Sequence, residues 1–302
     1  MEKYKLSINL VTYNAEKYIE LCLNSVFKQN FLDFQIIIVD NFSSDNTISI
    51  IENDFLNKYK NIKLIKNSEN LGFAKAHNIA INESNSEYLL LLNQDIILEK
   101  NYISYIINFL DNNKDYSSSN GKLLKLKFDE KNNIIKTNII DSLGLKPNFG
   151  YKFKNIAEGE FNSEKYNYDF DIWGVSGALP IYRRSSIYSV SNLKNNYYEV
   201  FDESFFMYKE DIDLAFRLKN NLFKARYISL SIAYHERGLK NKNGLLKKIK
   251  DKKKNTFLNY LSYKNHLLML YKNLNFKKFV IHLPFILYEE LKKFLYYLFY
   301  KP

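Results

Sequence analysis

Residues 34–47 read FQIIIVDNFSSDNT, and this stretch decides the fold class. Its opening residues FQIIIV are almost wholly apolar, which is typical of a parallel strand covered on both faces. The strand ends at Asp40, and Asp45 or Asn46 in the polar segment that follows can cap a helix. A buried strand that continues through a polar loop into a helix is the repeating unit of a parallel α/β sheet.

The same unit recurs on both sides of this stretch. Strand and helix patterns alternate before and after it: strands over 6–12, 62–65 and 87–92, and helices over 15–27, 47–59 and 73–82. We therefore expect an α/β fold with a Rossmann-like, mostly parallel sheet and right-handed crossovers, flanked by helices. Because ligands of such sheets bind outside the carboxyl ends of the strands, the loops after Thr12, Val39 and Leu92 should meet in one crevice.

The remainder of the chain is less regular. Residues 111–170 are rich in Asn, Lys and Gly, and they predict loops and short strands that could form a moving flap. An amphipathic helix is expected to begin near Glu210, and a strand pattern covers residues 226–233. Two helical segments are expected over residues 257–274 and 277–300.

The composition limits the cellular compartment and the kinds of binding partner that we expect for this chain. The chain has 302 residues and a net charge of +11, with a lysine-rich run over residues 240–254 that could meet nucleic acid, anionic lipid or water alone. Cys22 is the only cysteine, so no internal disulfide can form, which favours a reducing compartment. No secretory signal pattern follows Met1, and no apolar run reaches about 18 residues, so we expect a cytoplasmic protein without a membrane span.

Two carboxylates stand where strands of the expected sheet end. Asp40 could accept hydrogen bonds from a base or a ribose, as acidic residues do in dinucleotide-binding folds, or it could simply hold its turn. Asp95 follows the apolar strand and could bind Mg²⁺ or Mn²⁺ together with diphosphate oxygens, or it could end the strand in a turn. On the residues alone, both interpretations stay open.

Further candidates lie in the second half of the chain. Glu210, Asp211 and Asp213 open the expected helix, where carboxylates gain from the helix dipole. The segment before them is aromatic, so we also expect partial desolvation, which raises the pKa of a carboxyl and makes it a better base. His235 follows a strand pattern and is either a metal or diphosphate contact or a structural residue.

Several segments, taken in order, resemble the family 2 glycosyltransferases of the GT-A fold. They are INLVTYN (8–14), IIIVDNFSSDNT (36–47), NLGFAKAHNIAI (70–81), LLLLNQD (89–95), FDESFFMYKEDIDLAFRL (201–218) and AYHERG (233–238). The resemblance covers most of the chain, from about residue 6 to residue 273. It implies a GT-A-type sheet and a metal-dependent hexosyltransferase that moves a sugar from a nucleotide-diphosphate donor to an acceptor hydroxyl with inversion.

The resemblance also implies roles for individual residues. Asp211 matches the general base, with Glu210 as its acidic neighbour. Asp95 matches the last acid of the metal motif, which a histidine matching His235 joins in some members, so Mg²⁺ or Mn²⁺ is the implied cofactor. Asn93 stands where the first acid of that motif usually lies, which weakens the case for a metal. The implied nucleotide-sugar contacts are Thr12, Asn14, Asp40, Asn70, Gly72, Lys75, Asn78 and Asn93, and the donor sugar and acceptor would face Trp173, Gly177 and Ala178.

Two further segments are similar to the rhamnosyltransferase-like branch of the family. They are DSLGLKPNFGYKFKNIAEGE (141–160) and YLSYKNHLLMLYKN (260–273). This similarity implies rhamnose as one donor sugar, with galactose, N-acetylglucosamine and galactofuranose as alternatives, and a growing cell-surface glycan or a lipid-linked saccharide as the acceptor.

The implied domain organisation has a catalytic domain and a tail. We expect a catalytic domain over residues 1–240, made of a nucleotide-sugar half (1–118) and an acceptor half (119–240), and a basic, aromatic helical extension over residues 241–302. In that extension Leu291, Phe294, Leu295, Leu298 and Phe299 share one helix face. Together with the lysine run, this face predicts peripheral contact with the anionic inner surface of the plasma membrane, while packing on the catalytic domain and a homodimer contact are alternatives.

Other classes of function explain less of the sequence. A non-catalytic basic binding protein would account for the charge, but Asp40, Asp95 and Asp211 would repel nucleic-acid phosphates, so we expect no nucleic-acid partner. A nucleotidyltransferase would need a glycine- and lysine-rich phosphate loop after the first strand, and VTYNAEKY contains no glycine. A degenerate transferase that only binds its partner stays open because of Asn93, although the Glu210–Asp211 pair argues against it.

Overall fold

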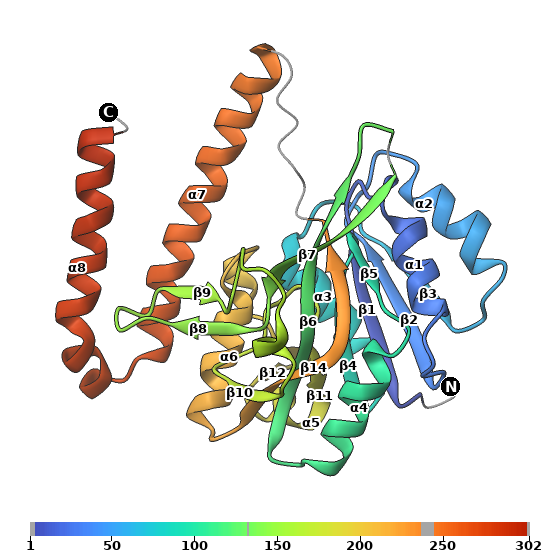
Figure 1. The fold of residues 1–302 in the computed structure, drawn as a ribbon, viewed down its shortest axis with the longest axis horizontal. Helices are drawn as coiled ribbons and strands as arrows, with labels where there is room; N and C mark the ends of the chain where they lie inside the picture. The colour runs from blue at the N-terminus through green and yellow to red at the C-terminus, as the bar shows by residue number, and fades with distance from the viewer. Residues whose placement is uncertain (1–3, 132, 237–244, 301–302) are drawn as a thin grey trace.

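The computed structural model describes residues 4–131, 133–236 and 245–300, and for residues 245–256 and 296–300 it describes the backbone only (Figure 1). The lysine-rich run and the tail positions Leu298 and Phe299 therefore lie outside the described side chains.

Within the described residues, the centre of the molecule is a ten-stranded sheet in the order β10-β14-β6-β11-β4-β1-β2-β3, with β5 added on β14 and β7 on β6. The strands are β1 Leu6–Thr12, β2 Phe34–Asp40, β3 Ile62–Lys66, β4 Tyr88–Asn93, β5 Ile96–Leu98, β6 Tyr116–Phe128, β7 Ile134–Ser142, β10 Phe170–Ile172, β11 Ile181–Arg183 and β14 Lys224–His235. Two small hairpins lie outside it: β8 Leu145–Pro147 with β9 Phe153–Asn155, and β12 Asn192–Lys194 with β13 Tyr197–Glu199.

Helices cover the sheet and continue beyond it. They are α1 Ile19–Phe27, α2 Thr47–Ile50 with a π-helical continuation Ile51–Leu56, α3 Gly72–Asn82, α4 Tyr102–Asn112, α5 Arg184–Ser189, α6 Glu210–Asn220, α7 Leu245–Asn273 and α8 Phe276–Tyr300. Among the described residues, no helix is both long and apolar enough to cross a membrane.

Strand β1 pairs in parallel with both β2 and β4, so the ends of these strands are level. Thr12 lies opposite Asp40 on one side, and Val11 lies opposite Asn93 on the other. The expected parallel core is confirmed, and β11 enters it in the antiparallel direction between β4 and β6. The carboxyl ends of β1, β2 and β4 therefore meet at one edge of the sheet.

Alternation along β2 explains why the sheet is covered on both faces. Ile36 and Ile38 pack in the core cluster shared with α1 and α4, whereas Ile37 and Val39 face the cluster that includes α3. All four side chains are at most 1% exposed. Full burial of such a side chain contributes about 1.5–3 kcal/mol.

The expectation of loops and short strands over residues 111–170 is wrong for its first part, where the strands are long. Residues 116–128 form β6, a long strand in the middle of the sheet, and β7 pairs with it. The run Ser117–Ser119 has weak strand propensity, but pairing with β14 and β11 on both sides overrides it. Gly121 is needed because a Cβ there would lie 2.1 Å from the carbonyl oxygen of Ser231, where β14 bulges past β6. Helix α4 has no counterpart among the expected elements.

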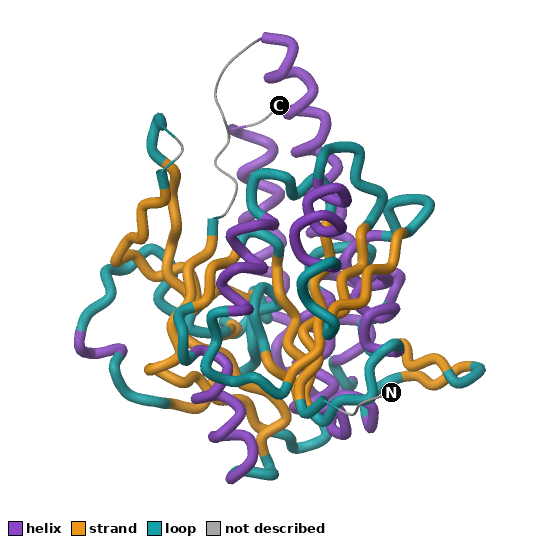
Figure 2. The backbone as a smooth tube through the Cα atoms, turned by 90° about the vertical axis from the view of Figure 1, so that its right-hand side faces the viewer, coloured by secondary structure: helices purple, strands orange, loops and turns teal. Residues whose placement is uncertain are grey.

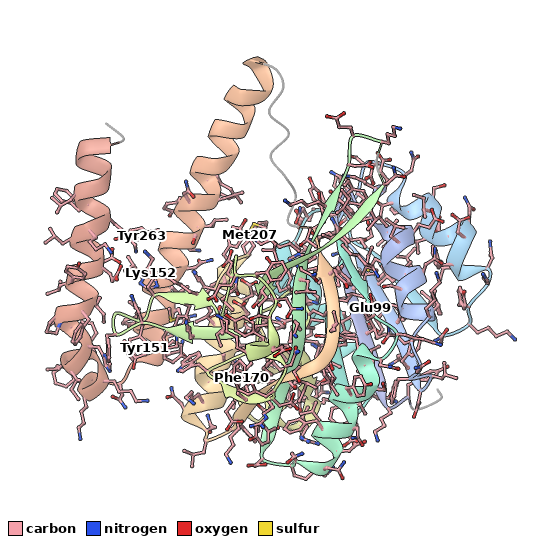
Figure 3. All side chains as sticks on the ribbon, in the orientation of Figure 1. Glu99, Tyr151, Lys152, Phe170, Met207 and Tyr263 are labelled. Atoms are coloured by element: carbon pink, nitrogen blue, oxygen red, sulfur yellow. The ribbon has the colours of Figure 1, made fainter. Side chains whose placement is uncertain are left out.

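The two C-terminal helices confirm the expected helical extension, although α7 begins at Leu245, earlier than the pattern indicates. Helix α8 lies beside α7, on the side of α7 away from the central sheet, and the start of α7 extends beyond the strands (Figures 1 and 2). The α7 residues Met269 and Leu270 share a core cluster with Ile212 and Phe216 of α6. The turn of the β8–β9 hairpin meets α8, where Asn148 donates to Glu289 at 2.9 Å, and Figure 3 shows Tyr151 and Lys152 on this side.

Candidate active site

Thr12 and Asp40, which end the adjacent strands β1 and β2, are joined through their side chains. Thr12 Oγ1 donates a hydrogen bond to Asp40 Oδ1 at 2.9 Å, and Ser43 donates to Asp40 through its backbone N–H (2.8 Å) and its hydroxyl (2.6 Å). Thr12 and Asp40 are fully buried. Asp40 therefore fixes two loops against each other. Its contact with a nucleotide base stays a prediction, and a base bound there would share the Asp40 carboxylate with Thr12 and Ser43.

Asn14 and Gln94 bring the loops after β1, β2 and β4 together. Asn14 has a left-handed φ of 50°, and its Oδ1 accepts from the Ser44 N–H at 2.9 Å. The Gln94 side chain accepts from the Tyr13 N–H at 2.8 Å and donates to the Tyr13 carbonyl at 3.2 Å. The predicted convergence of these loops is confirmed. Gln94 itself is not among the expected site residues, and its place inside the metal motif is the signal that could have found it.

Asn70 and Gly72 form a tight loop in front of α3. Asn70 Oδ1 accepts from the Gly72 N–H and from the side-chain amide of Asn41, both at 2.9 Å. Gly72 has a φ of +79°, and a Cβ there would lie 2.5 Å from the ring of Phe206. Only glycine fits both demands. Asn41, which the motifs do not single out, also accepts from the Leu71 N–H at 2.9 Å, and its position beside Asp40 is the available signal.

Lys75 and Asn78 occupy different surroundings on α3. Lys75 is exposed, whereas Asn78 is fully buried. The Asn78 side chain accepts from the Phe201 N–H at 2.8 Å and donates to the Phe201 carbonyl at 2.7 Å. Asn78 therefore fastens α3 to the segment before α6. The nucleotide contacts of Lys75 and Asn78 stay predictions.

Asp95, His235 and Asp141 form a line of hydrogen-bonding groups from three elements. His235 Nε2 lies 3.3 Å from Asp95 Oδ1, and His235 Nδ1 lies 2.9 Å from Asp141 Oδ2. His235 is 6% exposed and Asp141 is fully buried. Burial alone would lower the pKa of His235, but the hydrogen bonds to Asp141 and Asp95 and their charges outweigh it and raise the pKa to about 9. The motifs pair Asp95 with His235 but do not indicate Asp141, which lies in β7.

This line of groups fits a divalent cation in one respect. A metal-binding histidine commonly holds a carboxylate on its other ring nitrogen, as His235 holds Asp141. Among the described residues, however, no group of three or more His, Cys, Asp and Glu side chains could hold a metal ion. Asp95 and His235 could therefore supply two ligands, and a cation would take its remaining ligands from diphosphate oxygens and water.

Glu210 and Asp211 lie at the start of α6, where Glu210 is buried and Asp211 is half-buried. Glu210 is 6% exposed, and its Oε2 has no hydrogen-bond partner among the described residues. Burial, and then the charge of Asp211, raise the pKa of Glu210 to about 8. Burial also raises the pKa of Asp211, against the opposing effect of the Gly177 N–H, which donates to Asp211 Oδ2 at 2.9 Å. The expected partial desolvation is confirmed, and it suits a general base near neutral pH.

The turn that leads into this pair is strained. Phe206, Tyr208 and Lys209 all have positive φ values, of 60°, 71° and 75°. Each such residue costs of order 1–3 kcal/mol and persists only where surrounding contacts enforce it. One contact comes from α3, because the Phe206 carbonyl accepts from the N–H groups of Phe73 (2.7 Å) and Ala74 (3.2 Å). The turn therefore joins the start of α3 to the start of α6.

Gly177 and Ala178 connect Asp211 with the end of β4. Gly177 donates to Asp211, and the Ala178 carbonyl accepts from the Asn93 N–H at 3.1 Å. A Cβ at Gly177 would approach Asp211 Cβ to 3.1 Å. Trp173 is placed differently from these two: its ring packs edge-on against Phe153 and Phe216, at centroid distances of 4.5 and 4.7 Å. Its role in facing the sugar stays a prediction.

Comparison with known proteins adds a family match. The model of the family described as "Glycosyl transferase family 2" matches residues 7–189. An uncharacterized glycosyltransferase of Haemophilus influenzae is 30% identical over 130 residues, which are 43% of this chain and 40% of the relative. The poly(ribitol-phosphate) beta-N-acetylglucosaminyltransferase TarS of Staphylococcus aureus is 34% identical over 113 residues, which are 35% of this chain and 19% of the relative. The matched segments thus span less than half of either relative.

Solved structures share the fold. The crystal structure of S. aureus TarS 1–349 has a TM-score of 0.52 at 24% identity, covering 77% of this chain and 60% of that one. The crystal structure of GalNAc-T7 with UDP, GalNAc and Mn²⁺ has a TM-score of 0.63 at 12% identity, covering 80% of this chain and 45% of that one. At these identities the likeness shows the GT-A-like fold alone. None of these descriptions mentions rhamnose, so the rhamnosyltransferase-like branch gains no support from them.

Proposed function

The chain belongs to glycosyltransferase family 2, and we propose that it transfers a sugar from a nucleotide-diphosphate donor to an acceptor hydroxyl with inversion at the anomeric carbon. The observation that carries this proposal is the position of Asp211. It is a partly desolvated carboxylate held by the Gly177 N–H, and Gly177 is directly followed by Ala178, whose carbonyl accepts from Asn93 at the end of β4. A base on one side of the crevice and the strand ends on the other suit a single displacement.

In that displacement Asp211 acts as the general base. It accepts the proton of the acceptor hydroxyl while that oxygen attacks the anomeric carbon from the face opposite the nucleotide. The bond between the anomeric carbon and the diphosphate oxygen breaks, and its electron pair leaves with the diphosphate. Holding both substrates in line supplies much of the rate. Burial and the charge of Asp211 raise the pKa of Glu210, which makes Glu210 more readily protonated than a solvent-exposed glutamate.

The donor would lie against the ends of β1, β2 and β4. We assign the base and ribose to Asp40 with Thr12 and Asn14, and the diphosphate side to Asn93 and its loop. Asn70 and Gly72 shape the loop beside the nucleotide, and both accept hydrogen bonds from the side-chain amide of Asn41. Lys75 is exposed on α3 and can approach the donor from solvent. The sugar itself would face Gly177 and Ala178, with Trp173 behind them.

A divalent cation, Mg²⁺ or Mn²⁺, is proposed at Asp95 and His235. When bound, it would neutralise charge on the departing diphosphate. Asp141 holds the His235 ring so that Nε2 points at Asp95, which keeps both donors turned to one point. The family resemblance and the carboxylate–histidine pairing support the metal. Because position 93 is an asparagine and not an acid, the protein would supply fewer carboxylate ligands to the cation.

The proposed acceptor is a hydroxyl of a cell-surface polymer. The description of TarS as acting on poly(ribitol-phosphate) supports a teichoic-acid-type polymer, and a lipid-linked saccharide is the form expected at a membrane. Rhamnose, implied by the segments 141–160 and 260–273, is one donor sugar to test beside N-acetylglucosamine.

We further propose that residues 1–240 form the catalytic domain, in the halves 1–118 and 119–240, and that residues 241–302 form an extension. On α8, exposed apolar side chains include Val280, Leu287, Leu291 and Phe294. Such a face suits peripheral contact with the anionic cytoplasmic surface of the plasma membrane. A homodimer through the same face is the alternative, and vesicle co-sedimentation against light scattering distinguishes the two.

The proposed function is tested with a panel of nucleotide sugars, including UDP-N-acetylglucosamine and dTDP-rhamnose, with and without Mn²⁺ or Mg²⁺. Thermal unfolding should show stabilisation by one donor, of about 2.7 kcal/mol at a hundredfold excess over Kd. The same donor should be hydrolysed slowly in the absence of acceptor, and NMR should show the inverted anomer as first product. No stabilisation and no hydrolysis with any donor would contradict the proposal.

A further inference from the structure

One buried amide of α7 contacts the strained turn in front of the acidic pair. Asn265 is fully buried, and its Nδ2 donates to the carbonyl oxygens of Phe205 (2.8 Å), Met207 (2.9 Å) and Tyr208 (2.9 Å). Two amide hydrogens thus serve three acceptors, so at least one hydrogen is shared. Met207 is labelled in Figure 3, where it lies between α7 and the sheet.

The direction of these hydrogen bonds is fixed by the turn itself. All three neighbours are carbonyl groups, which only accept, so the NH₂ end of Asn265 must face them. Its Oδ1 is buried without a hydrogen-bond partner among the described residues. A buried acceptor left without a partner is unfavourable, so packing alone would favour an apolar residue at this position. What Asn265 supplies is donation to the turn.

The turn held in this way connects both halves of the crevice. Between its contacts with Asn265 it offers the Phe206 carbonyl to the start of α3, directly after Gly72. At its end it continues into Glu210 and Asp211. Its left-handed residues do not hold this shape by preference, because non-glycine side chains disfavour positive φ. Asn265 satisfies the carbonyls that such a reversed chain leaves pointing inward.

We infer that Asn265 is a positioning residue for glycosyl transfer: through its side-chain amide, α7 holds the turn 205–209 and so sets Asp211 against the donor loop. The inference rests on the proposed function, and it makes α7 a part of the active site rather than an appendage. It also gives a role to the segment YLSYKNHLLMLYKN (260–273), in which Asn265 and Asn273 both lie.

Asn273 provides a matched control within the same helix. It is also buried, at 8% exposure, and its Nδ2 donates to Asp213 Oδ1 at 2.7 Å. That contact ties α7 to Asp213 in the first turn of α6, and the Asn273 side chain does not bond the carbonyls of Phe205, Met207 or Tyr208. Asn273→Ala should therefore loosen the packing of α7 in the way that Asn265→Ala does, without releasing the carbonyls of the turn.

The test compares Asn265→Ala, Asn265→Asp and Asn273→Ala in the full chain, with steady-state kinetics of donor turnover. Both Asn265 variants should lose kcat, by about a hundredfold for a displacement on the order of 1 Å, with little change in the donor KM. Asn265→Asp keeps the shape of asparagine, but a carboxyl group buried against three carbonyls is protonated and offers one donor hydrogen in place of two. Asn273→Ala should keep kcat near that of the wild type.

The concentration of folded enzyme is determined from nucleotide-binding stoichiometry, so that partial unfolding of a variant is not mistaken for a loss of kcat. If Asn265→Ala proves too unstable, Asn265→Ser takes its place. The inference is overturned if the Asn265 variants retain kcat or if Asn273→Ala loses kcat equally. An inactive wild-type protein would instead overturn the proposed function, so the two failures are distinguishable.

Discussion

The backbone N–H of Gly177 donates a hydrogen bond of 2.9 Å to Asp211 Oδ2, and the position where a Cβ of residue 177 would stand lies 3.2 Å from that same oxygen. The proposed base is therefore held by a residue that has no room for a side chain. This contact also links Asp211 to the end of β4, because Ala178 follows Gly177 directly and its carbonyl accepts from the Asn93 N–H.

Gly177→Ala should lower kcat while leaving nucleotide binding almost unchanged. The added methyl would crowd Asp211 at 3.1–3.2 Å and displace its carboxylate, and displacements on the order of 1 Å can cost about a hundredfold in rate. Gly159→Ala is the control, since nothing lies within 4 Å of its Cβ position, although its φ of +85° makes alanine unfavourable there. Equal kcat values for the two variants would argue against the Gly177 contact.

Glu210→Gln should make the free energy of unfolding less dependent on pH. The pKa of Glu210 is about 8 in the folded protein, against an ordinary value of 4.5. Between these values the folded state binds more protons than the unfolded state, so stability is greatest at the acidic end and falls as the pH rises through the window. The substituted amide cannot ionise, and the variant should gain stability relative to wild type at pH values of about 8–9. Denaturant unfolding at several pH values measures this, and parallel curves for both proteins would contradict it.

Asp141→Ala should weaken the response to a divalent cation. The carboxylate orients His235 through Nδ1, and loss of such a supporting group typically costs about 10–100-fold in metal affinity. The activating concentration of Mn²⁺ should rise accordingly. Asp171→Ala serves as control, because Asp171 pairs with Arg226 at the surface instead. An unchanged Mn²⁺ requirement would remove Asp141 from the proposed metal site.

Gly72→Ala should destabilise the fold by about 2 kcal/mol or more, because a left-handed φ and a backbone clash combine at this position. The added Cβ would stand 2.6 Å from the Phe206 carbonyl oxygen, which caps the start of α3. Chemical denaturation gives the change in unfolding free energy. A loss below about 0.5 kcal/mol, the range of ordinary surface substitutions, would show that the loop relaxes without cost.

The parallel core and its crevice can be predicted from the sequence, because the carboxyl ends of parallel strands lie at the same edge of a sheet. Apolar strands with polar residues after them are enough to place Thr12, Asp40 and the loop holding Asn93 at one edge. The β6 strand cannot be found in this way, because Ser117–Ser119 become a strand only through neighbours on both sides. Asp141 escapes prediction for the same reason, since it lies in β7, within a stretch whose composition is typical of loops.

Asn265 cannot be assigned from local pattern either. Its acceptors lie 57–60 positions earlier in the chain, and their carbonyls point inward only because Phe206, Tyr208 and Lys209 have positive φ. The spacing of apolar and polar residues along the sequence does not predict such backbone turns. The aromatic segment before Glu210 does predict desolvation of the acidic pair. Amino-acid composition indicates the burial of a segment more directly than it indicates the backbone geometry of a turn.

The most direct measurement is the rate of sugar transfer by Asp211→Asn beside its affinity for the donor nucleotide. Loss of a general base should lower kcat by roughly 10²–10⁴-fold, while the amide keeps the Gly177 contact and the nucleotide affinity stays close to that of the wild type. Transfer at the wild-type rate by this variant would contradict the assignment of Asp211 and, with it, the account of how this site performs glycosyl transfer.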